Sequence, residues 1–431
     1  MLFTNLAPNT QLLDALKAVF LILTPWRFKK GTASLKVERF FSEILPGHTA
    51  FAFESGRTSL HAILTAMDIR NGDEVLLQAY TCVAVPEPIL WVGATPVFVD
   101  CDETLTMSIP DLEKKITPKT KAIIVQHTLG MPAHLDAIIA IAKAHNLLVI
   151  EDCAHALGAR YNNQIVGTFG DASFFSFGRD KVVSSVFGGV AATKHKALAD
   201  EISKIQSEYP MPSYGWIFQQ LLHPPIMWLG KKTYKFGGIL LIGIAKTFGI
   251  TSKAVQSQEK QGIRPTFALK RMPNALALLA LRQLKKLEHF NSHRQSLAKL
   301  YQELLSPLQI SSQFSSSIRD DSYSRIRDYS QTNQATTQPR NRPVYLRYTI
   351  WTDKREEIYT ACKKEGILLG DWYDTVIAPR GVNYEKINYQ QGSCPNAERI
   401  AKGTLNLPTD IHTSASDAKK IAKIIEVVLK K

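Results

Sequence analysis

Short apolar runs alternate with helical patterns from Phe51 to Lys194, and this alternation limits the possible fold more than any other feature. Five runs read EVLLQAY, TPVFVD, KAIIVQHT, LLVIED and ASFFSFG, and patterns such as PEPILWVG and LDAIIAIAKAHN separate them. Continuous apolar strands joined by helical crossovers are typical of a mainly parallel sheet covered on both faces. We therefore predict an α/β protein whose ligands bind at the carboxyl ends of the strands.

The 431 residues are too many for one typical core, so a large domain and a smaller one are expected. The later part of the chain has a strand-like run at Val344–Trp351 and an amphipathic helical pattern at Ser414–Leu429, which indicate an α+β domain. We predict an N-terminal amphipathic arm, a large domain with an apolar insertion, and a small C-terminal domain with a polar, mobile insertion. The arm comprises residues 1–30. The large domain comprises residues 31–290, with its insertion at about 208–264, and the small domain comprises residues 291–431, with its insertion at about 311–342.

The net charge of +14 favours anionic partners such as nucleic acid, phospholipid or phosphorylated small molecules. Nucleic acid is not expected, because the chain has neither zinc-finger spacing nor a basic helix interleaved with aromatic residues. The five cysteines include no CxxC pair, which indicates a reduced, cytoplasmic protein, and no metal site is predicted. No cationic region precedes the first apolar stretch, so no signal peptide is expected.

Two segments outside the alternating region are unusually apolar. In the N-terminal segment 9–26, six apolar residues share one helical face: Leu12, Leu13, Leu16, Val19, Phe20 and Leu23. The insertion contains WIFQQLLHPPIMWLG and FGGILLIGIAKTFGI, both shorter than a membrane span, among seven basic and two acidic residues. We expect these segments to pack on the protein body or a dimer partner, with an interfacial membrane helix as the alternative.

Lys181 and Asp152 suggest a pyridoxal phosphate (PLP) site. Lys181 follows the aromatic run SFFSFGRD, and Asp152 ends the apolar run LLVIED. A lysine amine forms a Schiff base with the PLP aldehyde, and a carboxylate keeps the pyridine nitrogen protonated so that the ring draws electrons. Taken singly, each residue has a simpler explanation: Lys181 as a surface lysine after a strand, and Asp152 as a helix cap.

Five further residues could complete such a site. Gly56 and Arg57 open a helical run, where free backbone N–H groups can bind phosphate, and Ser176 stands at a strand end. Tyr80 could stack on a flat cofactor, or be a half-buried strand aromatic. His155 could contact the cofactor ring, or be an ordinary partly buried histidine.

Four stretches resemble the DegT/StrS-type nucleotide-sugar aminotransferases, which are PLP enzymes of fold type I: FAFESGRTSLHAILTAM, EDCAHALGA, SFFSFGRDK and CPNAERIAKGTLNLPTD. The resemblance covers most of residues 31–205 and weaker parts of 265–431. It implies Lys181 as the Schiff-base lysine, Asp152 as the partner of the pyridine nitrogen, and His155 near the phenolic oxygen of PLP. It also implies phosphate binding by Gly56, Arg57 (through its backbone) and Ser176, and a homodimer with shared active sites.

The chain departs from the family pattern at four places that affect the pocket. Cys82 stands where an aromatic residue is common, and Val182 where an asparagine follows the lysine. Val186-Phe187 replaces Gly-Glu, and Leu269-Lys270-Arg271 replaces Asn-Tyr-Arg. These changes predict a less polar pocket and a more lipophilic acceptor.

The resemblance implies an aminotransferase that moves an amino group from an amino acid to the keto group of a nucleotide sugar or related acceptor. We expect the amino acid to be glutamate. The first alternative is a sugar dehydratase of the same fold, but relatives that eliminate water replace the lysine that stands here as Lys181. The second is a catalytically silent, membrane-associated binding protein, against which the pair Lys181 and Asp152 argues.

Overall fold

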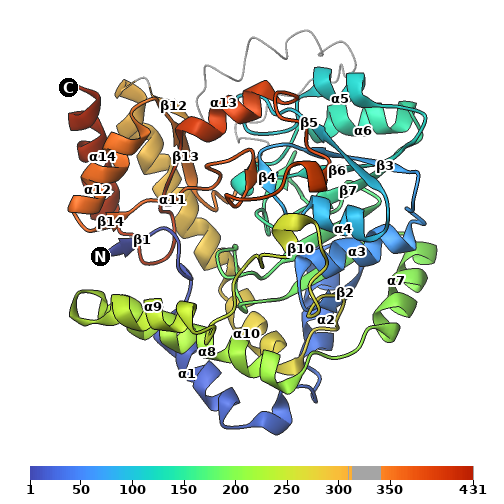
Figure 1. Ribbon diagram of the computed structural model, residues 1–431, viewed down its shortest axis with the longest axis horizontal. Helices are drawn as coiled ribbons and strands as arrows, with labels where there is room; N and C mark the ends of the chain where they lie inside the picture. The colour runs from blue at the N-terminus through green and yellow to red at the C-terminus, as the bar shows by residue number, and fades with distance from the viewer. Residues whose placement is uncertain (309, 313–340, 431) are drawn as a thin grey trace.

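The computed structural model describes residues 1–308, 310–312 and 341–430 (Figure 1). Its centre is a seven-stranded sheet in which β11 is antiparallel to both neighbours, while the other six strands point one way. The strand order across the sheet is β2 (Thr49–Phe53), β11 (Gly189–Thr193), β10 (Ala172–Ser176), β7 (Leu148–Asp152), β6 (Thr120–Gln126), β3 (Glu74–Gln78) and β5 (Thr95–Val99). The predicted mainly parallel sheet is confirmed.

Helices cover both faces of this sheet because successive residues of each strand point to opposite sides. On β6, Ile123 and Val125 join one apolar core, whereas Ala122 and Ile124 join the other. The first core is completed by α2 (Ala33–Ile44), α5 (Ile109–Lys115), α6 (Leu135–Ala144) and α10 (Asn274–Leu284). The second is completed by α3 (Gly56–Ala66), α4 (Pro86–Trp91), α7 (Lys196–Glu208) and α13 (Pro395–Gly403).

The C-terminal part builds a third core on a small antiparallel sheet, β12 (Ser311–Ser312), β13 (Tyr348–Trp351) and β16 (Thr404–Leu407). Three helices pack there: α11 (Leu287–Leu305), α12 (Arg355–Lys364) and α14 (Ala415–Leu429), the last capped by Ser414. The domain division at 290/291 stays a prediction. The predicted polar insertion falls almost entirely outside the described residues.

Three short strand pairs join distant parts of the chain. β1 (Leu2–Phe3) pairs in parallel with β14 (Ile367–Leu368) and ties the N-terminus to the third core. β4 (Thr81–Cys82) pairs in parallel with β15 (Ile377–Ala378), which brings a C-terminal segment over the end of the central sheet. β8 (Arg160–Tyr161) and β9 (Gln164–Ile165) form a small hairpin.

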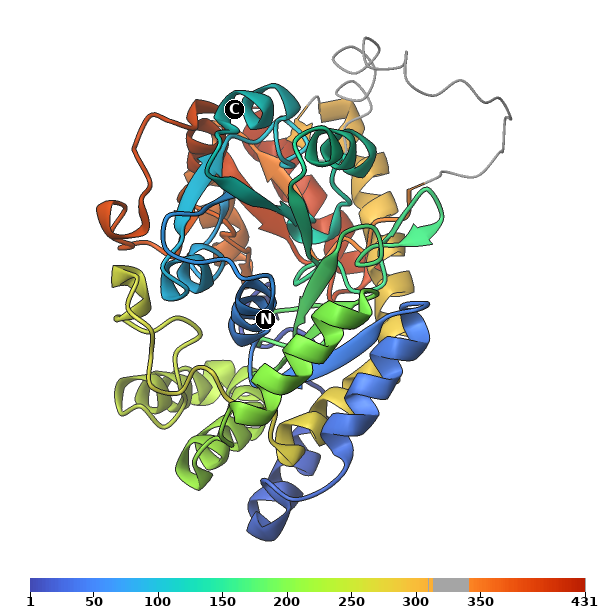
Figure 2. The ribbon, with the colours of Figure 1, turned by 90° about the vertical axis from the view of Figure 1, so that its right-hand side faces the viewer.

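The N-terminal segment and the apolar insertion form helices at one end of the molecule. They are α1 (Leu12–Ile22), α8 (Tyr214–Lys232) and α9 (Gly238–Thr247), and both α1 and α9 pack on α8 (Figures 1 and 2). The N-terminal helix packs on the protein body as expected, but it contacts the body through the face opposite to the predicted apolar one. It buries Asp14, Ala15, Ala18 and Leu21 and turns its larger apolar residues outward. No helix among the described residues is long and apolar enough to cross a bilayer.

Candidate active site

Six of the seven predicted site residues line one cavity of about 440 Å³ at the carboxyl ends of β7 and β10. Asp152 ends β7 and His155 follows it; Ser176 ends β10, and Lys181 lies in the loop that leads to β11. The remaining two, Gly56 and Arg57, open α3. Parallel strands place their carboxyl ends on one edge, which is why residues about 120 positions apart in the chain meet here.

The Lys181 amine points at the His155 ring, with 2.7 Å between Nζ and Nε2. His155 Nδ1 accepts a hydrogen bond from the Leu129 N–H at 3.2 Å, so a neutral ring carries its proton on Nε2 and donates it toward the lysine. Burial, together with the neighbouring lysine, holds the pKa of His155 well below its usual range. Burial also lowers the pKa of Lys181. The shift of Lys181 favours the uncharged amine, which is the nucleophilic form of lysine.

The Asp152 carboxyl is buried beside this pair. Its Oδ1 accepts a hydrogen bond from the Ala154 N–H at 2.9 Å, the contact expected of a residue that caps the next turn. Burial raises the pKa of Asp152, and the nearby Lys181 opposes that rise. A cationic group in the cavity would stabilise the ionised carboxylate in the same way.

The N-terminus of α3 and the end of β10 meet closely enough to form an anion site. Ser55 caps the helix through the Thr58 N–H, at 3.3 Å, and the helix points its first amides toward the cavity. A Cβ added at Gly56 would lie 3.0 Å from Ser176 Cβ, so a side chain at this position would crowd that serine. The Arg57 side chain turns away to form an ion pair with buried Glu259, which leaves its backbone for a ligand.

Tyr80 does not lie where the stacking hypothesis requires, and that prediction is corrected. Its ring is fully buried behind the cavity, against the edge of Tyr373, with 5.4 Å between ring centroids. Its hydroxyl donates to Thr404 Oγ1 at 3.0 Å and accepts from the Tyr373 N–H at 3.0 Å. A tyrosine with both hydrogen-bonding functions satisfied inside the protein is a packing residue. Cys82, two residues later, lines the cavity instead.

Trp372 and Tyr373 are site residues that sequence reasoning missed. Both line the cavity, because the pairing of β4 with β15 carries their segment across the sheet end. The Trp372 ring stacks on His155 at 5.5 Å between centroids and lies 5.0 Å from Lys181 Nζ. The Tyr373 hydroxyl is 3.3 Å from His155 Nε2. The pair of aromatic residues in GDWYD was the available signal, but its place in the fold depends on a contact that is distant in sequence.

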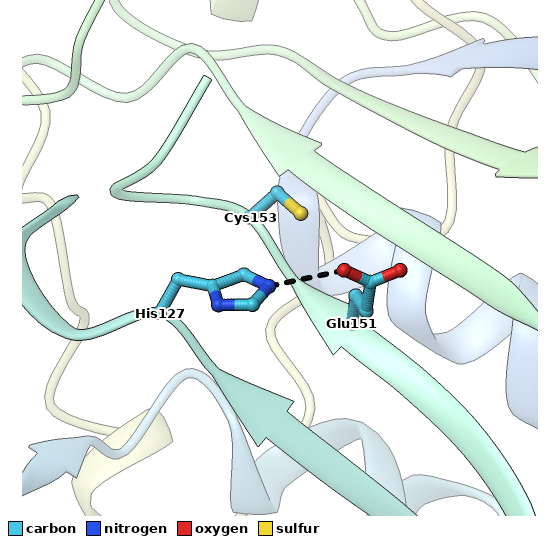
Figure 3. A group of neighbouring side chains, drawn as sticks. All are labelled: His127, Glu151 and Cys153. Atoms are coloured by element: carbon cyan, nitrogen blue, oxygen red, sulfur yellow. Dashed lines mark hydrogen bonds and ion pairs between the residues drawn. The ribbon is translucent and has the colours of Figure 1, made fainter. Parts of the chain in front are cut away.

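His127, Glu151 and Cys153 gather beneath the cavity close enough to suggest a metal site, but the hydrogen bonds indicate a structural cluster (Figure 3). The Glu151 carboxylate accepts from His127 Nε2 and from the backbone N–H groups of residues 167, 169 and 170. His127 Nδ1 accepts from the Ala133 N–H at 3.1 Å. These contacts satisfy the carboxylate and both ring nitrogens, so the cluster fastens two loops to β7, the strand that carries Asp152.

The residues of the cavity fit PLP. A lysine amine with a lowered pKa, a buried carboxyl and a helix N-terminus closed by Gly56 and Ser176 supply the three contacts that this cofactor needs. The volume is in the range of small-molecule sites. The fold and the site together place this protein in the fold class of the PLP-dependent aminotransferases.

Comparison with known proteins identifies the family. The model of the DegT/DnrJ/EryC1/StrS aminotransferase family matches residues 14–215 and 242–426, and the chain belongs to this family. Aminotransferases of this family use PLP, so the predicted family and cofactor are confirmed. A solved aminotransferase from Psychrobacter cryohalolentis has a TM-score of 0.70 and 20% identity, covering 98% of each chain, which confirms the predicted fold class.

Two curated relatives show how far sequence similarity extends. The chain is 44% identical over 176 residues to GDP-perosamine synthase of Escherichia coli O157:H7, covering 41% of this chain and 48% of the relative. It is 27% identical over 408 residues to the spore coat polysaccharide biosynthesis protein SpsC of Bacillus subtilis strain 168, covering 93% and 90%. The match spans about half the length of the first of these relatives.

Proposed function

We propose that this protein is a PLP-dependent aminotransferase that moves an amino group from an amino acid to a keto group on a nucleotide-linked sugar. The expected amino donor is glutamate. The observation that carries the proposal is the Lys181 amine, held 2.7 Å from His155 in a cavity that also exposes Asp152. Relatives named GDP-perosamine synthase and UDP-N-acetyl-3-dehydro-alpha-D-glucosamine 3-aminotransferase support the sugar acceptor.

Each cavity residue has a separate task in this proposal. Bound PLP supplies an aldehyde for the lysine and a ring that draws electrons from the reacting carbon. Lys181 would hold that aldehyde through its amine, and the same amine would serve as the base and acid that moves a proton at the reacting carbon. Asp152 would provide the negative charge that keeps the ring nitrogen protonated. The first amides of α3, with Ser176, would bind the phosphate.

His155 and Trp372 position the lysine. The Nε2–H of His155 is directed at Nζ by the Leu129 contact on the opposite ring nitrogen. Trp372 covers that ring and limits access of water to the amine. We assign both residues to orientation rather than to bond making, because His155 contacts the Lys181 amine and Trp372 stacks on the His155 ring.

One part of the pocket wall suits a partly apolar acceptor, whereas charged residues such as Arg179, Lys253 and Asp374 line other parts. Cys82, Val186 and Phe187 line the cavity where the family pattern has larger or more polar residues. Phe187 packs against Trp216 and Phe267, which extends the apolar wall toward α8. An acceptor with a lipophilic portion would meet this wall without leaving polar groups unpaired.

The two alternative functions have weaker support. A dehydratase of this fold is disfavoured because Lys181 is present and faces the cavity. A silent binding protein is disfavoured because Lys181, His155 and Asp152 line one cavity together, as a PLP enzyme requires. We also propose that the protein is a homodimer, as is typical of the family. We propose that it is located in the cytoplasm, which includes the cytoplasmic face of a membrane.

The test of this function is a product assay with the full-length protein loaded with PLP. Glutamate and a set of nucleotide-linked keto-sugars are supplied, and amino-sugar nucleotides are detected by mass spectrometry. The proposal expects an aminated product from at least one keto-sugar, together with an equal amount of 2-oxoglutarate. A water-loss product without amination would instead support the dehydratase, and no product from any amino acid and keto-sugar pair would contradict the proposal.

A further inference from the structure

We propose that the end of the molecule formed by α1, α8 and α9 binds the surface of an anionic lipid bilayer. This inference deepens the proposed location and does not depend on the proposed activity. The term apolar face denotes the exposed residues that carry it: Leu12, Leu13, Leu16, Val19, Phe20, Leu23 and Trp26 of the N-terminal segment, and Phe236, Ile239, Leu240, Ile244 and Phe248 of the α8–α9 arm.

The apolar side of helix α1 points toward solvent, and the side that carries Asp14 points toward the protein. On its inner side, Asp14 accepts hydrogen bonds from Arg282 at 2.8 Å and Gln283 at 2.8 Å, both from α10. On its outer side, Leu13 is 58% exposed and Leu16 is 52% exposed. A surface helix normally buries its apolar stripe, so one that buries a carboxylate and exposes leucines is typical of an interfacial helix.

The α8–α9 arm exposes a second set of large apolar side chains. Phe236 is 89% exposed and Leu240 is 67% exposed. The arm is anchored from behind: Ile242 packs with Ala7 and Met227, and Lys231 Nζ donates to the Ala7 carbonyl at 3.0 Å. The exposed residues therefore project from a fixed base beside α1. The family model leaves out residues 216–241, so most of α8 and the start of α9 lie outside the family match.

The charge around the apolar face selects the partner. Residues 209–258 contain no carboxylate side chain, and three of their lysines, Lys232, Lys235 and Lys246, are exposed on the α8–α9 arm. At the N-terminal segment, Lys17 Nζ lies 5.0 Å from the Phe20 ring and Lys29 Nζ lies 4.6 Å from the Tyr214 ring. Cations that rest on aromatic rings at the rim of an apolar surface match the boundary between lipid tails and anionic head groups.

A second copy of the chain fits this surface less well. A twofold interface places the same patch on both partners, so the basic arm would meet a surface that is itself basic and to which residues 209–258 contribute no carboxylate. Anionic lipid removes that repulsion and also receives the apolar side chains. The bilayer is therefore the occupant that satisfies both features of the surface.

Flotation with vesicles tests the inference directly. PLP-loaded full-length protein is mixed with phosphatidylcholine vesicles, or with vesicles that include about 30 mol% phosphatidylglycerol. We expect flotation with the anionic vesicles at about 0.1 M salt, and a several-fold decrease at about 0.5 M salt, where surface charges are screened. Protein that stays unbound with both vesicle types at low salt would overturn the inference.

Surface variants locate the contact. Leu16→Ser with Phe20→Ser, and separately Phe236→Ser with Leu240→Ser, should each lower the affinity for anionic vesicles at least about tenfold. Lys235→Glu with Lys246→Glu should lower it about fivefold or more per lysine at low salt, and far less at high salt. The matched controls are Val427→Ser, which alters an exposed apolar residue on α14, and Lys419→Glu on the same helix; both should bind like the wild type.

Two results would contradict the assignment. Equal flotation of the apolar-face variants and the Val427→Ser control would place the lipid contact elsewhere. Conversion of a dimer to a monomer by Phe236→Ser with Leu240→Ser, in a protein that never floats, would show that the face joins two copies. Because vesicle binding and amino-sugar formation are measured separately, failure of this inference is distinguishable from failure of the proposed function.

Discussion

At the scale of single residues, the charge state of Lys181 follows from what surrounds it. Burial lowers the pKa of its amine, Arg347 lowers it further, and Cys82 and Asp152 oppose the shift. His155, uncharged because burial depresses its own pKa, adds no competing cation. The lowered pKa of the Lys181 amine is thus a consequence of the fold before any cofactor binds.

Lys181→Ala should remove the visible absorbance that PLP gains when bound through the lysine, and reduce turnover to background. The side chain supplies a bond to the cofactor rather than packing, so the melting temperature of the cofactor-free protein should change little. Spectra and thermal melts of variant and wild type provide the measurement, with Lys419→Ala as the control. Wild-type turnover in Lys181→Ala would exclude this lysine.

Asp152→Asn should keep the shape of the site and remove its negative charge. Without the charge the ring draws electrons poorly, and turnover should fall by about a thousandfold, equivalent to about 4 kcal/mol of transition-state stabilisation. Steady-state kinetics at saturating PLP measure this change. A decrease of less than about tenfold would mean that Asp152 serves only to cap the turn at Ala154.

Glu87 makes stability depend on pH. Burial raises its pKa to about 8, and its carboxylate oxygens have no hydrogen-bond partner among the described residues. The folded state thus favours the protonated form. This stabilising contribution is complete below a pH of about 4.5, and decreases by up to about 1.4 kcal/mol per pH unit as the pH rises to about 8.

Glu87→Gln, which is uncharged at every pH, should remove this dependence. The variant should be more stable than the wild type near a pH of about 8.5 and differ little near a pH of about 5. Chemical denaturation at both pH values provides the comparison, and Glu303→Gln on α11 serves as an exposed control. Stability curves that run parallel for Glu87→Gln and wild type would contradict the protonated state.

At the scale of elements, the N-terminal arm supports the loop that carries Lys181. Asn9 Nδ2 donates to the Lys181 carbonyl at 2.7 Å and to the Val182 carbonyl at 3.0 Å. Arg294 of α11 donates to Asn9 Oδ1 and to the Val182 carbonyl, both at 2.9 Å. The arm and α11 therefore hold the backbone of the lysine loop from behind, where the family pattern has an asparagine and this chain has Val182.

Asn9→Ala should loosen this loop. Loss of buried hydrogen bonds should lower the free energy of unfolding by about 1–3 kcal/mol, and weaken PLP binding by more than the control Asn71→Ala, an exposed turn residue. Denaturant melts and titration of cofactor absorbance measure the two effects. Equal PLP affinity in Asn9→Ala and wild type would show that the arm stabilises the fold without positioning Lys181.

The central elements could be predicted because their signals are local. The five apolar runs became β3, β5, β6, β7 and β10, and the strand-end positions of Asp152 and Ser176 followed from them. The helical stretch from Asn274 to Leu305 divides at Lys285–Lys286, because α10 packs in the core of the central sheet and α11 in the C-terminal core.

Features that depend on distant contacts could not be predicted. Periodicity showed that α1 has an apolar face, but not that the face points to solvent, because that depends on the Asp14 contacts with α10. Trp372 and Tyr373 reach the cavity through the pairing of β4 with β15. The same pairing packs Tyr80 out of the cavity, against the stacking prediction.

At the scale of the whole molecule, the cavity and the apolar face are adjacent. The segment after α9 passes from the arm to the cavity, where the Ala254 carbonyl accepts from Arg57 at 3.3 Å and Ser252 contacts Arg179. Ala254 and Arg179 both line the cavity. An enzyme docked through the arm would thus hold its cavity close to the membrane, where a partly lipophilic acceptor is found.

The central claim, an aminotransferase that acts through Lys181, is tested most directly by absorbance of the PLP-loaded protein during titration with glutamate. The account predicts loss of the visible band of the lysine-bound cofactor, with one 2-oxoglutarate formed per site, and return of the band when excess 2-oxoglutarate is added. A band that stays unchanged with glutamate and with every other common amino acid, and no 2-oxoglutarate, would contradict it.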